Sequence, residues 1–119
     1  MSALSDNVRI LVVDDERVIS DTLATILRAR GYRTRVAYCA DEAIALASEF
    51  RPHALIADVV MPGMDGRQLA GYFGEHHPEC KVMLISDGLA AGPQLLKSAQ
   101  RILDFLASCT LEEPGADEG

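Results

Sequence analysis

Short apolar runs of strand length alternate with helix-patterned stretches along most of this chain. The run at residues 8–13 is apolar almost throughout, as expected of a strand that is buried on both faces. Apolar residues at helical spacing then follow, and a glycine or proline commonly ends each helical stretch. Strands that alternate with helices favour right-handed crossovers, which produce a parallel sheet covered on both faces. The sequence therefore predicts an α/β fold.

The pattern gives approximate bounds for each expected element. Strands are expected at 8–13, 33–37, 53–57, 81–85 and 102–106. Helices are expected between them at 16–30, 41–50, 66–75 and 93–98. The sheet would then have five strands. Pro114-Gly115 interrupts the last acidic segment, so we expect a domain at 1–110 and a disordered tail at 111–119.

Composition narrows the class of protein. A chain of 119 residues is typical of one domain. Its net charge of −7 argues against unaided binding to nucleic acid. Neither a signal-peptide pattern nor a membrane-length apolar stretch is visible, so a cytoplasmic location is expected. The three cysteines form no Cys-x-x-Cys pair, which argues against a zinc or redox motif and favours small buried thiols in a reducing compartment.

Acidic residues follow two of the expected strands. Asp14 and Asp15 come directly after the first strand, and Asp58 follows the third. In a doubly wound sheet these two strands are neighbours, so the carboxylates should meet at the edge where ligands bind. Carboxylates that repel one another suit Mg²⁺, and the backbone carbonyl of Val60 could complete the site. Asp58 could then attack a phosphoryl group as a carboxylate nucleophile.

Two further residues are predicted near the phosphoryl group. Ser86 ends the fourth expected strand at the same sheet edge, where its hydroxyl could donate to a phosphoryl oxygen. Phe105 on the fifth expected strand would lie beside Ser86. A change at Ser86 could therefore be transmitted to a buried or rotated aromatic ring.

With Asp14-Asp15, Asp58, the turn Met61-Pro-Gly-Met-Asp-Gly66 and Ser86, the chain resembles the receiver domain of two-component response regulators over about residues 8–110. The resemblance implies a flavodoxin-like fold with strand order 2-1-3-4-5. It also implies that Asp58 is the phosphoacceptor and that Asp14 and Asp15 hold Mg²⁺. Ser86 would be the switch hydroxyl, and Phe105 would match the switch aromatic position.

The same resemblance implies a function in signalling rather than an enzymatic activity. The donor would be a phosphohistidine on a sensor histidine kinase or a histidine phosphotransfer protein. The phosphorylated domain would then signal through contacts with a downstream protein. No direct role with nucleic acid or membrane is expected.

The chain departs from the family pattern on the phosphate side of the site. The family places Lys and then Pro at the end of the fifth strand, where this chain has Ser108-Cys109. Asp87 directly follows Ser86, at a position where the family favours a small residue. A carboxylate there would repel the charge of an attached phosphoryl group, which is about −1.5 to −2. These departures favour an alternative in which the chain is a pseudo-receiver with little or no phosphorylation.

The end of the chain is a third departure. Compared with the family, the fifth helix is cut here to residues 110–113, which would leave part of the sheet bare. Since exposed apolar surface usually marks an interaction site, a homodimer through the fourth helix and fifth strand is expected, or a partner that covers the same face.

A phosphohydrolase of the haloacid dehalogenase type is a third functional class. It would also use an aspartate nucleophile, but it needs a second Asp two residues later as general acid. That position holds Val60, so the sequence disfavours this class.

Overall fold

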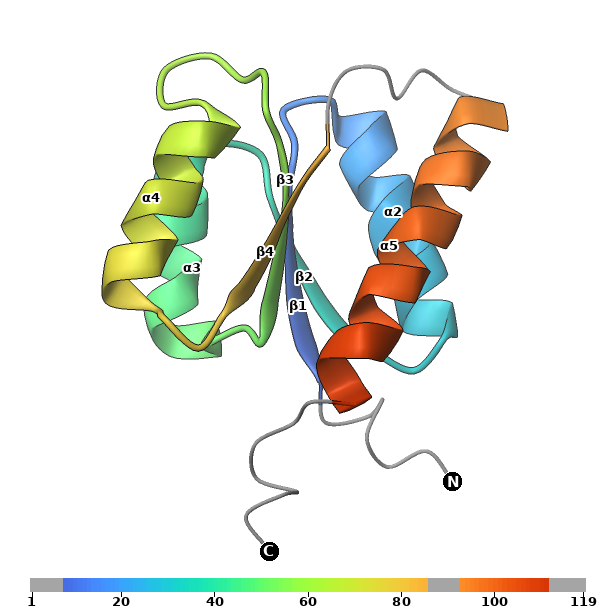
Figure 1. Ribbon diagram of the computed structural model, residues 1–119. Helices are drawn as coiled ribbons and strands as arrows, with labels where there is room; N and C mark the ends of the chain where they lie inside the picture. Colours follow the sequence, from blue (N-terminus) through green and yellow to red (C-terminus); the bar gives the residue numbers. More distant parts are fainter. Residues whose placement is uncertain (1–7, 86–92, 112–119) are drawn as a thin grey trace, which may run out of the picture.

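The computed structural model of the protein describes residues 8–85 and 93–111, which form alternating strands and helices (Figure 1). The strands are β1 (Arg9–Val13), β2 (Arg33–Ala37), β3 (Ala54–Asp58) and β4 (Lys81–Ile85). The helices are α2 (Arg17–Ala29), α3 (Ala40–Phe50), α4 (Gly66–His76) and α5 (Pro93–Leu111). None of these helices is both long enough and apolar enough to span a membrane.

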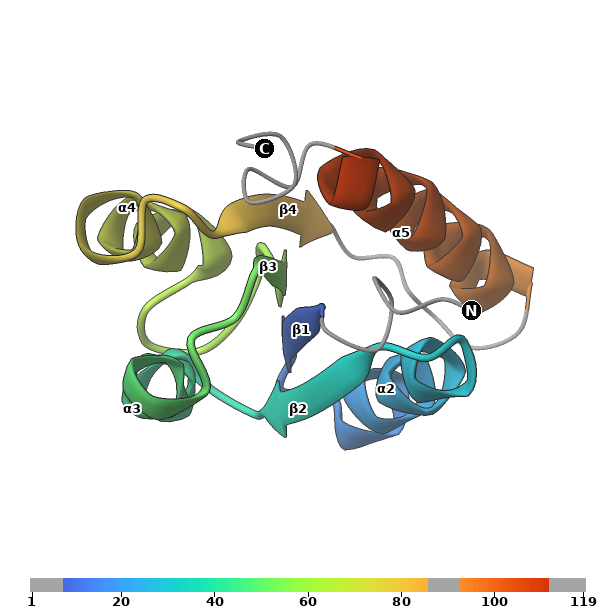
Figure 2. The same cartoon turned by 90° about the horizontal axis from the view of Figure 1, so that it is seen from below.

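The strands of the described part form one parallel sheet in the order β2-β1-β3-β4. Helices α2 and α5 lie on one face of the sheet, and α3 and α4 lie on the other (Figure 2). This arrangement confirms the doubly wound α/β fold, because crossovers of one hand place helices on both faces.

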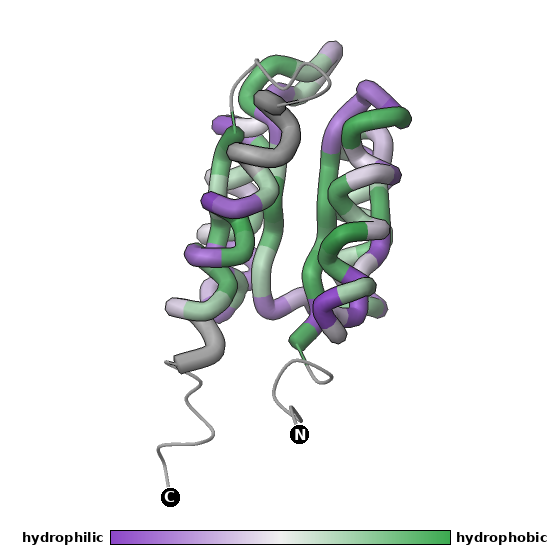
Figure 3. Tube along the Cα trace, turned by 90° about the vertical axis from the view of Figure 1, so that its right-hand side faces the viewer, coloured by the Kyte–Doolittle hydropathy of each residue, from purple (hydrophilic) through white to green (hydrophobic). Residues whose placement is uncertain are grey.

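A separate apolar core fills each side of the sheet. On the α2 and α5 side, Ile10, Val12 and Ile56 pack against Leu23 and Leu27. The opposite face of the same strands supplies the second core, in which α4 contributes its largest buried side chains, Leu69 and Phe73. The hydrophobic colouring of the central strands in Figure 3 reflects this burial on both faces.

The prediction of a fifth strand is wrong, because residues 102–106 lie inside α5. Ala99, Ile102 and Leu106 are buried at helical spacing against the core on the α2 side. The short run Ile-Leu-Asp-Phe-Leu has the length and apolar content of a strand. Such a run cannot be distinguished from a segment of buried helix by its local sequence alone. No proline or glycine follows Pro93 within α5 to interrupt the longer helical pattern. The described sheet therefore has four strands.

This correction changes two other expectations. Phe105 lies on α5 and is partly buried against the core, so the strand placement on which its switch role depended is wrong. Residues 110 and 111 are the end of α5, the helix that follows β4, so they are not the remnant of a separate helix as predicted. Compared with the expected order 2-1-3-4-5, the described residues contain no strand beyond β4. Consequently, the predicted dimer face cannot include a fifth strand at residues 102–106.

Candidate functional site

The carboxyl ends of β1 and β3 bring three carboxylates together. β1 and β3 are hydrogen-bonded neighbours, with Val13 in register with Ala57. The residues that follow this pair in the sequence therefore emerge at one edge of the sheet. One carboxylate oxygen from each of Asp14, Asp15 and Asp58 lies within 4.8 Å of the others. The acids that the sequence placed in one site are thus adjacent in the structure.

Asp14 is the buried member of this group, with 1% of its surface exposed. Its Oδ1 accepts a hydrogen bond of 2.9 Å from the backbone N–H of Glu16, which shapes the turn into α2. Burial raises the pKa of Asp14 from 3.8 to about 6, and the nearby charges of Asp58 and Asp15 add to this rise. The hydrogen bond from Glu16 acts in the opposite direction because it stabilises the carboxylate.

The donor set fits a hard divalent cation. Mg²⁺ prefers carboxylate and carbonyl oxygens, and usually keeps several waters beside one or two protein carboxylates. Asp15 is exposed and Asp58 is half-buried, so the cluster is open to solvent on one side. A cation would also offset the repulsion and burial that raise the pKa of Asp14.

The backbone after Asp58 turns back over the strand end. Val60 is exposed, and its N–H donates to Oδ1 of Asp58 at 3.2 Å, so the loop orients this carboxylate. The N–H of Val59 donates to the carbonyl of Ile85 on β4 at 2.9 Å. These contacts hold the position of Val60 close to Asp58, as the prediction of a backbone ligand requires.

Gly66 allows α4 to begin directly against the site. Its N–H donates to the carbonyl of Val59 at 3.0 Å, and a Cβ at this position would overlap the backbone of Asp58. Gly63 has a φ of +77°, a conformation that favours glycine. The two glycines of the Met-Pro-Gly-Met-Asp-Gly turn thus have separate geometric functions.

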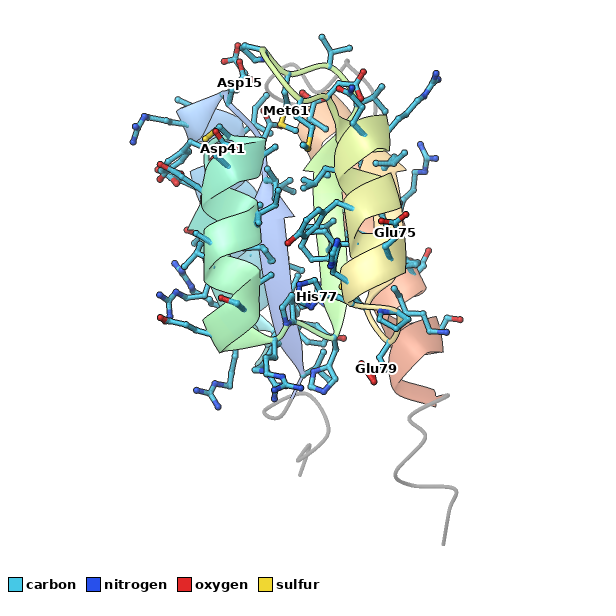
Figure 4. All side chains as sticks on the ribbon, turned by 90° about the vertical axis from the view of Figure 1, so that its left-hand side faces the viewer. Asp15, Asp41, Met61, Glu75, His77 and Glu79 are labelled. Carbon is cyan, nitrogen blue, oxygen red and sulfur yellow. The ribbon has the colours of Figure 1, made fainter. Side chains whose placement is uncertain are left out.

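A capping box fixes the start of α4. Oδ1 of Asp65 accepts from the N–H of Gln68 at 3.0 Å, and the N–H of Asp65 donates to Oε1 of Gln68 at 2.9 Å. Met61, in the same loop, is buried in the core on the α4 side. Figure 4 shows Asp15 and Met61 at one end of the molecule, opposite to His77 and Glu79.

A polar cluster beside the site was not predicted from the sequence. The hydroxyl of Tyr38 donates to Oδ1 of Asp21 at 2.7 Å, and the guanidinium of Arg17 lies 4.0 Å from the centre of the Tyr38 ring. The hydrogen bond to Asp21 raises the pKa of Tyr38. These residues come from α2 and from the loop after β2, and no local motif links them. Only the pairing of β2 with β1 indicates that they are close.

Two residues of the predicted site, Ser86 and Asp87, lie outside the described residues. Ile85, the last residue of β4, is in register with Asp58.

The response regulator receiver domain family matches residues 10–106. The chain belongs to this family. The acidic cluster and the turn from Met61 to Gly66 both lie within the matched residues. Receiver domains typically bind Mg²⁺ through acidic residues of this kind. Their general role is that of phosphoacceptors in response regulators, and they are generally not enzymes in their own right.

Two curated relatives illustrate the sequence likeness. The response regulator MprA of Mycobacterium tuberculosis is 44% identical over 69 residues, which are 55% of this chain and 30% of MprA. The nitrogen assimilation regulatory protein NtrX of Azorhizobium caulinodans is 40% identical over 79 residues, which are 65% of this chain and 17% of NtrX. The matched segment is therefore less than a third of either relative.

Solved structures extend the likeness to the fold. The NtrX receiver domain of Brucella abortus is 30% identical with a TM-score of 0.64, over 80% of this chain and 98% of that one. The regulator TrrA of Thermotoga maritima, solved with Mg²⁺ and BeF, is 25% identical with a TM-score of 0.72, over 86% and 98%. A CheY-like receiver of Methanospirillum hungatei is 24% identical with a TM-score of 0.76, over 94% and 98%, and supports the fold alone.

Proposed function

We propose that this receiver accepts a phosphoryl group on Asp58 and signals by protein contact within a two-component phosphorelay. The convergence of Asp14, Asp15 and Asp58 within 4.8 Å is the observation that supports the proposal best. It places a half-buried carboxylate beside a set of oxygens suited to Mg²⁺. A location in the cytoplasm remains a prediction from the sequence.

The proposed reaction is a transfer between two protein side chains. An oxygen of Asp58 attacks phosphorus, the bond from phosphorus to the donor's imidazole nitrogen breaks, and neutral imidazole leaves after protonation. The donor would be a sensor histidine kinase or a histidine phosphotransfer protein. The hydrogen bond from the N–H of Val60 to Oδ1 of Asp58 orients this carboxylate.

Asp14, Asp15, Asp58 and the backbone carbonyl of Val60 would hold Mg²⁺, which supplies charge neutralisation for the phosphoryl oxygens. Ser86 follows β4 and would donate its hydroxyl to one of these oxygens. Phe105 is not part of the proposal, because it lies on α5 within the core.

Intact-mass spectrometry after incubation with a small acyl phosphate and Mg²⁺ tests the proposal. We expect one phosphoryl group that is sensitive to hydroxylamine, as an acyl phosphate should be, and absent from Asp58→Asn. Asp65→Asn serves as the matched control, since it changes an acid on the same loop and Asn can still cap α4. Retention of the phosphoryl group in Asp58→Asn would contradict the proposal.

A pseudo-receiver is the second candidate function. The structure near the expected phosphate position favours it. β4 is an edge of the described sheet, and no strand in residues 8–85 or 93–111 brings a cation to the outer side of β4. Lys81 begins β4 and is thus at the end of the strand remote from Asp58, which is in register with Ile85. Absence of both an adduct and Mg²⁺ affinity in the wild type would favour this function.

A further inference from the structure

Arginines gather at the edge of the sheet opposite the three carboxylates. Because the strands are parallel, β1 and β2 begin at this edge, and α2 and α3 end at it (Figure 1). Arg9 and Arg33 are the first residues of their strands, Arg30 follows α2, and Arg51 follows α3. Arg9 is half-buried and the other three are exposed. We call these four residues the basic edge.

Like charges lie close together at the basic edge. Arg9 and Arg33 are partners in the pairing of β1 with β2, and neighbouring strands are only about 4.7–4.9 Å apart. Nε of Arg9 donates to the carbonyl oxygens of Phe50 at 2.8 Å and of Arg51 at 2.9 Å. A carbonyl oxygen accepts these hydrogen bonds but does not neutralise the guanidinium. An anion at this edge would therefore relieve the repulsion between the arginines.

The described acids do not supply this anion. Within residues 8–85 and 93–111, none of the four arginines forms an ion pair with an acid. Glu49, in the last turn of α3, is the described acid closest in sequence to Arg51, and it is exposed. The guanidinium groups thus keep donors that can bind carboxylates, which the planar fork of arginine fits well.

The acids that follow α5 match the basic edge in charge. Residues 112–118, which we call the acidic segment, hold Glu112-Glu113 and Asp117-Glu118, and these four acids account for more than half of the net charge of −7. Pro114-Gly115 lies between the two pairs, and this dipeptide favours a turn. The carboxyl end of α5 carries a partial negative charge and has no basic residue in its last turn. Acids placed there gain stability from nearby arginines.

α5 brings the acidic segment to the basic edge. It lies beside α2 on the same face of the sheet (Figure 2) and ends at the edge where β1 and β2 begin. Leu106, near its end, packs in the same core as Tyr32, the residue before Arg33. Packed helices are about 8–10 Å apart, whereas seven extended residues span up to about 23–25 Å. The acidic segment is therefore long enough to reach Arg30 and Arg33.

We propose that the acidic segment folds back along the basic edge and pairs its carboxylates with Arg30, Arg33 and Arg9. Exposed ion pairs are individually weak, but attachment to α5 gives the segment an effective concentration in the millimolar range or above. The segment then competes with any acidic partner for this edge. The inference does not depend on phosphorylation of Asp58, because the basic edge lies at the other ends of the strands.

Amide NMR of the full chain tests the contact. The comparison is between the wild type and an acidic-segment variant that carries Glu112→Gln, Glu113→Gln, Asp117→Asn and Glu118→Gln. At low salt, the amide signals of residues 30–33 should differ between the two proteins, while those at the carboxyl ends of β1 and β3 should not. In 1 M salt, where the Debye length is about 3 Å, the differences should disappear. Identical signals of residues 30–33 at low salt would overturn the proposal.

Two other occupants of the basic edge give different results in the same experiment. If Asp6→Asn reproduces the change at residues 30–33 and the acidic-segment variant does not, the acid before β1 is the occupant, and the proposal is overturned. Differences that grow with protein concentration would mean that the acidic segment binds a second copy. They would overturn the fold-back within one chain.

A poly-glutamate peptide, used as a probe for an acidic partner, tests the competition. At low salt it should bind the acidic-segment variant at least about 10-fold more tightly than the wild type, because the edge is then unoccupied. Adding Arg30→Gln and Arg33→Gln to this variant should abolish the gain.

Arg67→Gln is the matched control for the lost charge. Arg67 is exposed in the first turn of α4, at the opposite edge of the sheet, so this change in the acidic-segment variant should keep the gain. Equal affinity of the peptide for the wild type and the acidic-segment variant would overturn the competition. A gain that survives Arg30→Gln with Arg33→Gln would overturn the assignment of the basic edge as the site.

Discussion

The backbone of Gly66 lies directly against the main chain of Asp58, so that α4 begins in contact with the end of β3. A Cβ at position 66 would overlap the Asp58 carbonyl, and the neighbouring atoms are backbone, which cannot move aside cheaply. We expect Gly66→Ala to lower the free energy of unfolding by about 1–3 kcal/mol. Urea denaturation measures this change.

Gly71 provides the matched control for that prediction. It lies on the exposed side of α4, and a Cβ there would meet no atom within 4 Å. Since alanine favours a helix over glycine, Gly71→Ala should stabilise the protein by up to about 1 kcal/mol. Equal effects of the two substitutions would contradict the close contact between Gly66 and Asp58.

The raised pKa of Asp14 predicts how stability without Mg²⁺ depends on pH. In the unfolded chain Asp14 ionises near 3.8, whereas in the folded chain it keeps its proton until about pH 6. Between these values the folded state binds more protons, so its stability should fall as the pH rises. Relative to wild type, Asp14→Asn should be more stable at neutral pH by roughly 2–3 kcal/mol, and nearly equal below about pH 4.

Mg²⁺ should reverse the difference in stability between the wild type and Asp14→Asn at neutral pH. Because the cation offsets the charge of Asp14, it should raise the melting temperature of the wild type at neutral pH more than that of Asp14→Asn. Thermal unfolding with and without Mg²⁺ at two pH values measures both effects. An equal Mg²⁺ shift in the two proteins would argue against Asp14 as a ligand.

The capping box of α4 should contribute measurably to stability. Asp65→Ala removes the acceptor for the N–H of Gln68, and we expect it to cost about 1 kcal/mol. Asp65→Asn keeps an acceptor oxygen and should cost much less. Urea unfolding of the wild type and the two variants gives the comparison. Similar losses of stability in Asp65→Ala and Asp65→Asn would show that the lost cap is not the cause.

Burial of the end of α5 gives a test of the corrected fold. Leu106 is fully buried against the core beside α2, so Leu106→Ala should destabilise the protein by about 2–5 kcal/mol. Ser108, two residues later, is exposed, and Ser108→Ala should change stability by less than about 0.5 kcal/mol. A strand that exposed Leu106 would give a small loss instead.

Long-range patterns in the sequence predicted most of the fold and the acidic part of the site. The continuous run before Asp14 and the run before Asp58 identify buried parallel strands, and the topology of such a sheet alone brings their ends together. The turn before Gly66 carries its own signals of proline, glycine and an N-cap residue. These features depend on local chemistry and on one general rule of topology, so they can be predicted without coordinates.

The end of the chain could not be predicted in the same way. Residues 102–106 have a composition that suits either a strand or a buried helix, and packing against α2 decides between them. The contact of Tyr38 with Asp21 depends on the pairing of β2 with β1, which no local signal encodes. The error at α5 also concealed the most unusual feature of the described sheet, which is that β4 lies at its edge.

Residue-level mapping of the phosphoryl group tests the central claim most directly. The wild type would be incubated with a small acyl phosphate, with and without Mg²⁺, and the acyl phosphate reduced with borohydride before peptide sequencing by mass spectrometry. We predict modification at Asp58 that depends on Mg²⁺ and is abolished in Asp58→Asn. Modification at another residue, or at Asp58 to the same extent without Mg²⁺, would contradict the account.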